Sequence, residues 1–165
     1  MEGSDVQIQH PNREKAGAKA TKAGVVLLLV ASAALILVVF FGGLALLQGA
    51  HIVVIGYVIV YLIMAFFVAA RWSRGVLPLT AGLATVFIAM AAIAAPAWFA
   101  RDKPGLAESA FPPGLLGLLV LVIIAVQVLL IIFAMRGFSQ EWNVEIERTR
   151  GDDGTYRETE AAPAR

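Results

Sequence analysis

Long apolar blocks without charge occupy most of the middle of the chain. An α-helix rises about 1.5 Å per residue, so roughly 20 apolar residues cross a hydrocarbon core about 30 Å thick. Lipid offers no hydrogen bonds to the backbone, and the blocks lack the alternation of a barrel strand. The pattern therefore predicts an all-α fold, a four-transmembrane-helix bundle over residues 24–135. The four blocks, each free of Lys, Arg, Asp and Glu, are Gly24–Leu47, His51–Ala70, Val76–Phe99 and Gly114–Met135.

Positive charge is concentrated on one side of this predicted membrane domain. An even number of spans puts both tails on the same side, and nine Lys and Arg residues lie near helix ends there, against two on the other side. By the positive-inside rule, both termini are predicted to be cytoplasmic, in the cell inner (plasma) membrane. The nine are Arg13, Lys15, Lys19, Lys22, Arg71, Arg74, Arg136, Arg148 and Arg150; the two are Arg101 and Lys103.

The segments outside the spans are short and polar. Residues 1–23 are predicted to be a disordered basic tail, residues 136–150 a juxtamembrane interaction segment, and residues 151–165 a disordered C-terminal tail. The first apolar block is longer than a signal-peptide core, which favours a retained signal anchor over a cleaved signal. The architecture is thus one membrane domain with two tails.

The juxtamembrane segment has a pattern of its own. Polar and apolar residues alternate strictly from Glu141 to Glu147, the period of a half-buried strand. A lone strand is not stable, so we expect it to lie against the membrane face of the bundle or to join a protein partner. A helix that continues from the fourth span is the alternative. The predicted partner contacts are Phe138, Trp142, Val144 and Ile146.

Small residues predict how the helices pack, because lipid gives helices no hydrophobic drive to associate. The third block has Ala81, Thr85 and Ala89 at four-residue spacing, followed by Ala91 and Ala95. It is therefore expected to be the central helix. The fourth block is mostly Leu, Ile and Val, which is typical of a lipid-facing helix. In the first block, the pair Gly42–Gly43 indicates a bend or an end.

Polar residues inside the spans are the candidates for a site. Tyr57 and Tyr61 lie one turn apart on one helix face, where they line a ligand groove, donate to a quinone or, as we favour, bond a neighbouring helix. Gln127 lies mid-span and is expected to make an interhelical contact, within the bundle or in a homo-oligomer. Ser32 and the threonines can bond their own helix backbone, so they indicate no site.

The predicted outer side contains a histidine, His51, and the charged connection Arg101–Pro113 between the third and fourth blocks. One chain cannot bring two haem ligands or three zinc ligands to His51, although a two-fold dimer would pair two copies. We therefore favour an ordinary polar residue at a helix start and expect no cofactor. The connection reaches an extracytoplasmic partner or lipid headgroups or, as we favour, is a solvated loop. Its candidate residues are Trp98, Arg101, Asp102 and Lys103.

The segments Trp98–Gly105 and Met135–Glu147 flank one purely apolar helix. This arrangement resembles that of small four-pass membrane proteins of unknown function from high-GC bacteria such as actinobacteria. The resemblance covers the last third of the spans and one tail. It implies the four-pass architecture and no residue roles.

The composition excludes several classes of function. The chain is 59% hydrophobic with no cysteine and a net charge of +1, which excludes a soluble domain, thiol chemistry and a nucleic-acid surface. No spacing of acids, histidines or nucleophiles indicates an enzyme. We favour an accessory or scaffold subunit of a membrane complex. The alternative is a small oligomeric passive transporter, channel or lipid- or quinone-binding protein, since ion-coupled transport needs an ionisable group within the membrane.

Overall fold

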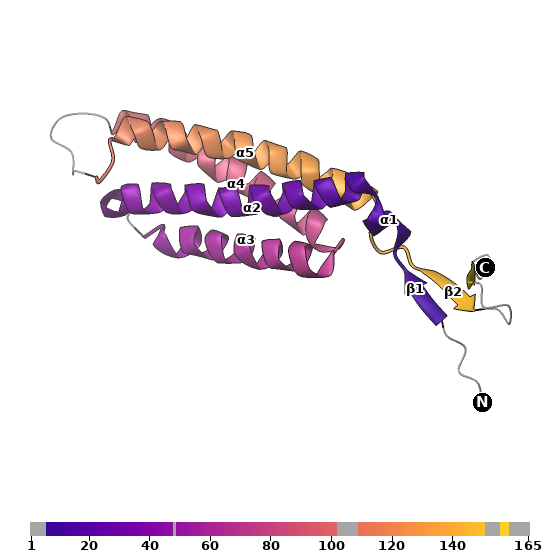
Figure 1. Cartoon of the computed structure of the whole chain (residues 1–165). Helices are drawn as coiled ribbons and strands as arrows, with labels where there is room; N and C mark the ends of the chain where they lie inside the picture. Colours follow the sequence, from indigo (N-terminus) through magenta and orange to yellow (C-terminus); the bar gives the residue numbers. More distant parts are fainter. Residues whose placement is uncertain (1–5, 48, 102–108, 151–155, 159–165) are drawn as a thin grey trace.

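The computed structural model describes residues 6–47, 49–101, 109–150 and 156–158. Within these ranges, four helices are long and apolar enough to cross a membrane, as predicted. They lie side by side as an elongated bundle (Figure 1). Their bounds are α2, Ala16–Gly42; α3, His51–Arg71; α4, Val76–Ala100; and α5, Pro113–Ser139.

The helix ends follow local chemistry. Helix α2 stops at Gly42 and gives way to a 3₁₀ turn, Leu44–Leu46, so the expected end at the Gly42–Gly43 pair is confirmed. Helix α5 begins at Pro113, where a missing N–H costs nothing because first-turn donors have no helical acceptor. Helix α3 ends at Arg71. The next residue, Trp72, adopts a left-handed φ of 51°, which turns the chain towards α4.

Helix α2 begins at Ala16, eight residues before the predicted first span. The expectation of a disordered tail over residues 1–23 is therefore wrong for the part that the structure describes. Before α2 lie a strand, β1 (Val6–Gln9), and a short helix, α1 (Pro11–Glu14). Tertiary contacts with residues near the other terminus order this segment, and a composition argument cannot detect such contacts.

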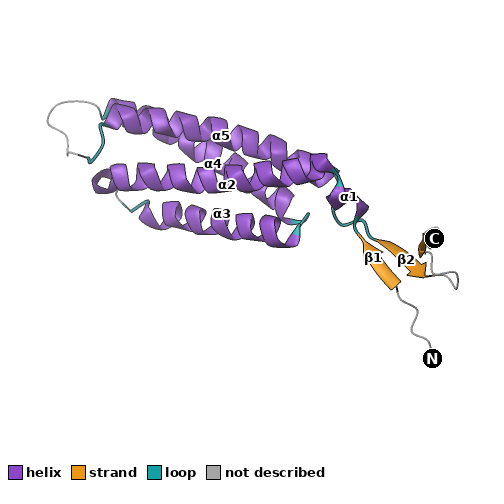
Figure 2. Ribbon diagram, viewed as in Figure 1, coloured by secondary structure: helices purple, strands orange, loops and turns teal. Residues whose placement is uncertain are grey.

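The two ends of the chain form a small antiparallel sheet outside the bundle (Figure 2). Strand β2 (Ile146–Arg150) is central, between β1 and β3 (Tyr156–Glu158), with Gln9 opposite Ile146. The all-α prediction is thus incomplete. The predicted strand over Glu141–Glu147 is also misplaced, because residues 142–143 form a turn and β2 starts at Ile146. Disorder is wrong for 156–158, and the other residues of 151–165 lie outside the described ranges.

Helix α2 lies between α3 and α5, and α4 packs along α5. The prediction that the third span is central is therefore wrong: Thr85 and Ala89 are exposed, although Ala91 and Ala95 are buried. The fourth span is not simply lipid-facing either. From Gly117 onwards its buried positions recur every three or four residues, as in a helix that packs on two neighbours. They are Leu116, Gly117, Val120, Ile123, Gln127, Leu130, Ala134 and Gly137.

Close packing of the helices depends on a glycine. A Cβ atom on Gly24 in α2 would lie 2.6 Å from the Phe133 ring of α5. That distance is far below van der Waals contact. The absence of a side chain at Gly24 therefore leaves room for the Phe133 ring between α2 and α5. The bundle has two ends. Ala16, the α3–α4 connection and Ser139 lie at the tail end, and residues 43–47, 49–50, 101 and 109–112 lie at the distal end.

Candidate functional site

A chain of hydrogen bonds joins three helices halfway across the bundle. The Tyr61 hydroxyl of α3 donates to Gln127 Oε1 of α5 at 2.9 Å, and Gln127 Nε2 donates to Ser32 Oγ of α2 at 3.0 Å. Ser32 Oγ in turn donates to the Leu28 carbonyl oxygen at 2.7 Å. The three side chains are fully buried. An unpaired polar group costs several kcal/mol in hydrocarbon, and these hydrogen bonds give each of the three side chains a partner.

These contacts are the interhelical bonds that we favoured for Tyr61 and Gln127, and they lie within one bundle. Ser32, which we did not regard as a site residue, is the acceptor that completes the chain. The sequence contained an indication of this role. A buried amide has both donors and an acceptor to satisfy, so Gln127 requires a hydroxyl or carbonyl acceptor as well as a donor. Satisfied in this way, the three polar residues hold helices together and leave no reactive group exposed.

Tyr57 differs from Tyr61 although they share a helix face. Its ring lies edge-to-face against Tyr61 and Phe87, with centroid separations of 5.8 and 4.9 Å. Its hydroxyl has no hydrogen-bond partner among the described residues. The side chain lines a cavity instead. Tyr57 thus brings to this region a hydroxyl group without a hydrogen bond to any described residue.

The cavity lies in the distal half of the bundle and has a volume of about 210 Å³. All four long helices contribute to its wall. It exists because α3 and α4 contact each other much less than the other neighbouring pairs do, and because several wall residues are alanines. The wall is almost entirely apolar, and Tyr57 and Trp98 are the lining residues with a polar side-chain group; it also includes Ile36, Phe40, Val53, Phe87, Met90, Ala91, Ala94 and Ile123.

The cavity reaches the lipid-facing surface of the bundle. Val53 of α3 and Met90 of α4 line it, and their side chains are 51% and 36% exposed. In a membrane, the surface on which they lie faces hydrocarbon. A hydrophobic molecule therefore has a lateral path into the cavity between α3 and α4.

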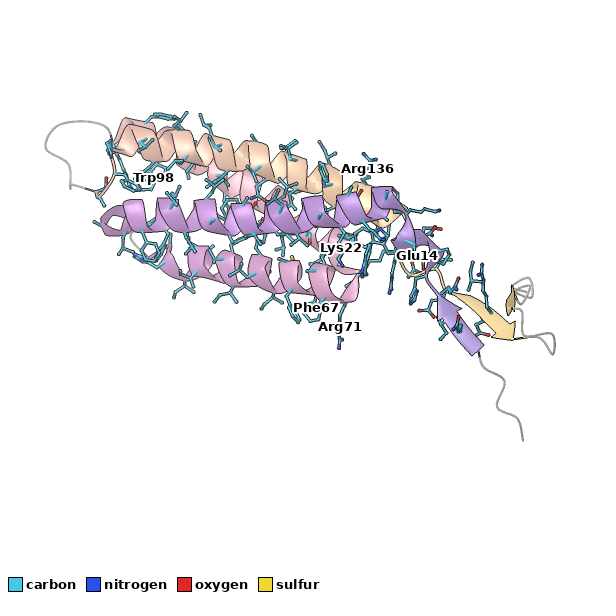
Figure 3. All side chains as sticks on the ribbon, viewed as in Figure 1. Glu14, Lys22, Phe67, Arg71, Trp98 and Arg136 are labelled. Carbon is cyan, nitrogen blue, oxygen red and sulfur yellow. The ribbon has the colours of Figure 1, made fainter. Side chains whose placement is uncertain are left out.

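Two candidates at the distal end, His51 and Trp98, have structural roles. His51 Nε2 lies 3.3 Å from the Leu44 carbonyl oxygen, and its ring contacts Phe40 edge-to-face. Trp98 is buried in the cavity wall at the distal end (Figure 3). The Arg101 guanidinium lies 5.6 Å from the centre of the Trp98 ring. Asp102 and Lys103 lie outside the described residues, so the proposed outer contact stays a prediction.

The juxtamembrane candidates are largely occupied by the protein itself. Trp142 is fully buried, lies edge-to-face on Trp72 at 5.2 Å and donates to Gln140 Oε1. Phe138 lies under the Arg74 guanidinium at 4.3 Å. Val144 and Ile146 are half-buried. In this fold Trp142 is not free to contact a partner, which is a correction to that part of the prediction.

The N-terminal segment is hydrogen-bonded to the turn that contains Trp142. Arg13 Nε donates to the Trp142 carbonyl oxygen at 2.8 Å, and Asn12 Nδ2 donates to that of Glu141 at 3.1 Å. Gln140 Nε2 donates to Thr21 Oγ1 of α2 at 3.0 Å. These hydrogen bonds therefore join the two tails to each other and to the bundle, in the region between the bundle and the terminal sheet.

No family model, curated protein or solved structure matches this chain. Within the described ranges, no three His, Cys, Asp or Glu side chains converge as a metal site would require.

Proposed function

We propose that this protein is a non-enzymatic component of the cell inner (plasma) membrane that binds a hydrophobic membrane molecule in the distal cavity. The observation that carries the proposal is the apolar cavity of about 210 Å³ with a lateral opening between α3 and α4. Pockets that enclose a whole small molecule are about 300–1,000 Å³. The cavity therefore suits part of a long molecule, such as an acyl chain or an isoprenoid tail.

The Tyr57 hydroxyl supports a ligand with an acceptor. A phenol buried in hydrocarbon gains from a hydrogen bond that water cannot supply there. Tyr57 lines the cavity without a protein partner among the described residues. A carbonyl oxygen, from a lipid ester or a quinone, fits this donor. The orientation belongs to the same proposal: nine cations at the tail side against two at the distal side favour cytoplasmic tails.

Filling the cavity tests the proposal. In Ala94→Phe, a ring replaces a methyl group in the cavity wall, so we expect several-fold less labelling by a lipid with a photoactivatable group in its acyl chain. In wild-type protein the labelled peptides should contain Val53–Tyr57 and Phe87–Ala94. Reconstituted full-length protein, photolysis and peptide mass spectrometry provide the measurement.

The matched control is Ala92→Phe, which adds the same ring to the exposed face of α4 outside the cavity. It should label like the wild type. Tyr57→Phe reports on the acceptor, because loss of one hydrogen bond should weaken binding about 2- to 10-fold. Equal labelling of Ala94→Phe and Ala92→Phe would refute the cavity as the binding site.

The second candidate is an accessory subunit, which the terminal sheet supports. Strand β1 is an edge of that sheet, and Ile8 on it is 58% exposed. Edge strands can accept a further strand from a partner. In Ile8→Lys, a charge in place of this exposed apolar side chain should abolish co-purification of a stoichiometric partner, whereas Gln7→Lys on the other face should retain it. A partner that survives both changes does not bind this edge.

A further inference from the structure

A second groove lies at the tail end of the bundle, between α2 and α3, and shares no residue with the distal cavity. Its volume is about 640 Å³. Polarity changes along its length. Lys19, Lys22 and Trp72 line one part, and Val26, Leu27 and Ala69 are among the apolar residues that line the rest. The groove is therefore cationic towards the tails and apolar towards the membrane interior.

The two lysines form a cationic pair on α2. Three residues apart on one helix, they lie on the same face. Lys22 Nζ lies 4.1 Å from the centre of the Trp72 ring, which holds the ammonium group at the groove. Neither lysine has a carboxylate within ion-pair distance in the part of the chain that the structure describes. The described residues thus supply this pair with no carboxylate counter-ion.

Trp72 marks the level of the groove in the membrane. Tryptophan favours the boundary between hydrocarbon and headgroups. Its position here is fixed by its left-handed backbone and by the Trp142 ring at 5.2 Å. Lys22, Arg71 and Arg136 lie at this same end of the bundle (Figure 3). The cationic part of the groove thus lies where lipid phosphates lie, and the apolar part lies where acyl chains begin.

We propose that this groove binds one anionic glycerophospholipid. Its phosphate lies between Lys19 and Lys22, and an acyl chain lies along Val26, Leu27 and Ala69. Charge complementarity selects an anionic headgroup over a zwitterionic one, because each cation near the surface adds to the attraction. The apolar part selects a lipid over free phosphate, which gains nothing from it. The site is independent of the distal cavity, so either proposal can fail alone.

Lipid titration of the full-length protein in mild detergent, followed by native mass spectrometry, tests this site. Wild-type protein should bind one phosphatidylglycerol roughly tenfold more tightly than phosphatidylcholine. The double variant Lys19→Gln, Lys22→Gln should lose this preference. The charge-matched control Lys15→Gln, Arg136→Gln removes two cations from the same end outside the groove and should keep it.

A second pair of variants tests the apolar part without changing charge. Ala69→Phe fills the groove and should weaken phosphatidylglycerol binding several-fold, whereas Ala70→Phe, exposed and outside the groove, should not. Equal binding of the two lipids by wild-type protein overturns the proposal. So does an equal loss in the two charge variants. Displacement of the lipid by inorganic phosphate, together with unaffected binding by Ala69→Phe, would show an anion site instead.

Discussion

Replacing Trp142 with alanine should lower the free energy of unfolding by about 3–5 kcal/mol, the cost of removing a large buried aromatic side chain. Trp142 is fully buried and fills the space beside Gly137, where an added Cβ atom would lie 3.1 Å from its ring. Its backbone carbonyl accepts from Arg13, and its ring contacts Trp72. Loss of the ring therefore weakens the tail end of the bundle and the attachment of the N-terminal segment together.

The measurement is unfolding in mixed micelles of mild and denaturing detergent, followed by circular dichroism. Phe66→Ala is the control, since Phe66 is 62% exposed to the surroundings of the bundle and its loss should cost less than about 1 kcal/mol. Trp142→Phe should fall between the two. Protease cleavage before Ala16 should accelerate in Trp142→Ala alone. Equal stability of the two alanine variants would contradict the packing role of Trp142.

The number and approximate bounds of the spans followed from the sequence because charge is excluded from hydrocarbon over a fixed length. The packed faces did not. In α5 almost every residue is apolar, so no contrast separates Leu116, which is fully buried, from Leu118, which is 54% exposed. In a soluble protein the exposed position would be polar and would reveal the period. Here both environments are apolar, and the face is decided by fit to neighbouring helices.

The terminal sheet was not predictable for a different reason. Alternation near Trp142 indicated a strand, but the partner of Ile146 is Gln9, at the other end of the chain. Local patterns carry no information about a pairing over such a separation. The same holds for Lys22 and Trp72, whose contact defines the tail-end groove. Each residue alone has the ordinary features of a membrane boundary.

Gln127→Ala is expected to lower the free energy of unfolding by about 2–4 kcal/mol. The change removes a fully buried side chain from the middle of α5 and breaks two hydrogen bonds: the Tyr61 hydroxyl loses its acceptor, and Ser32 Oγ keeps only its bond to the Leu28 carbonyl oxygen. The volume lost accounts for most of the effect, because a hydrogen bond between transmembrane helices is worth about 0.6 kcal/mol on average and at most about 1.7.

A double-mutant cycle separates the two contributions. Gln127→Met keeps the volume and removes the hydrogen bonds, so it should cost about 1 kcal/mol, as should Tyr61→Phe. Because the Tyr61 hydroxyl donates to Gln127, the double variant should cost little more than either single one. Additive costs would mean that the two side chains do not interact. Ser32 accepts from the same amide, so Ser32→Ala should also be less than additive with Gln127→Met. Coupling at both positions, in protein that stays monomeric, would establish that this polar chain joins α2, α3 and α5 of one molecule.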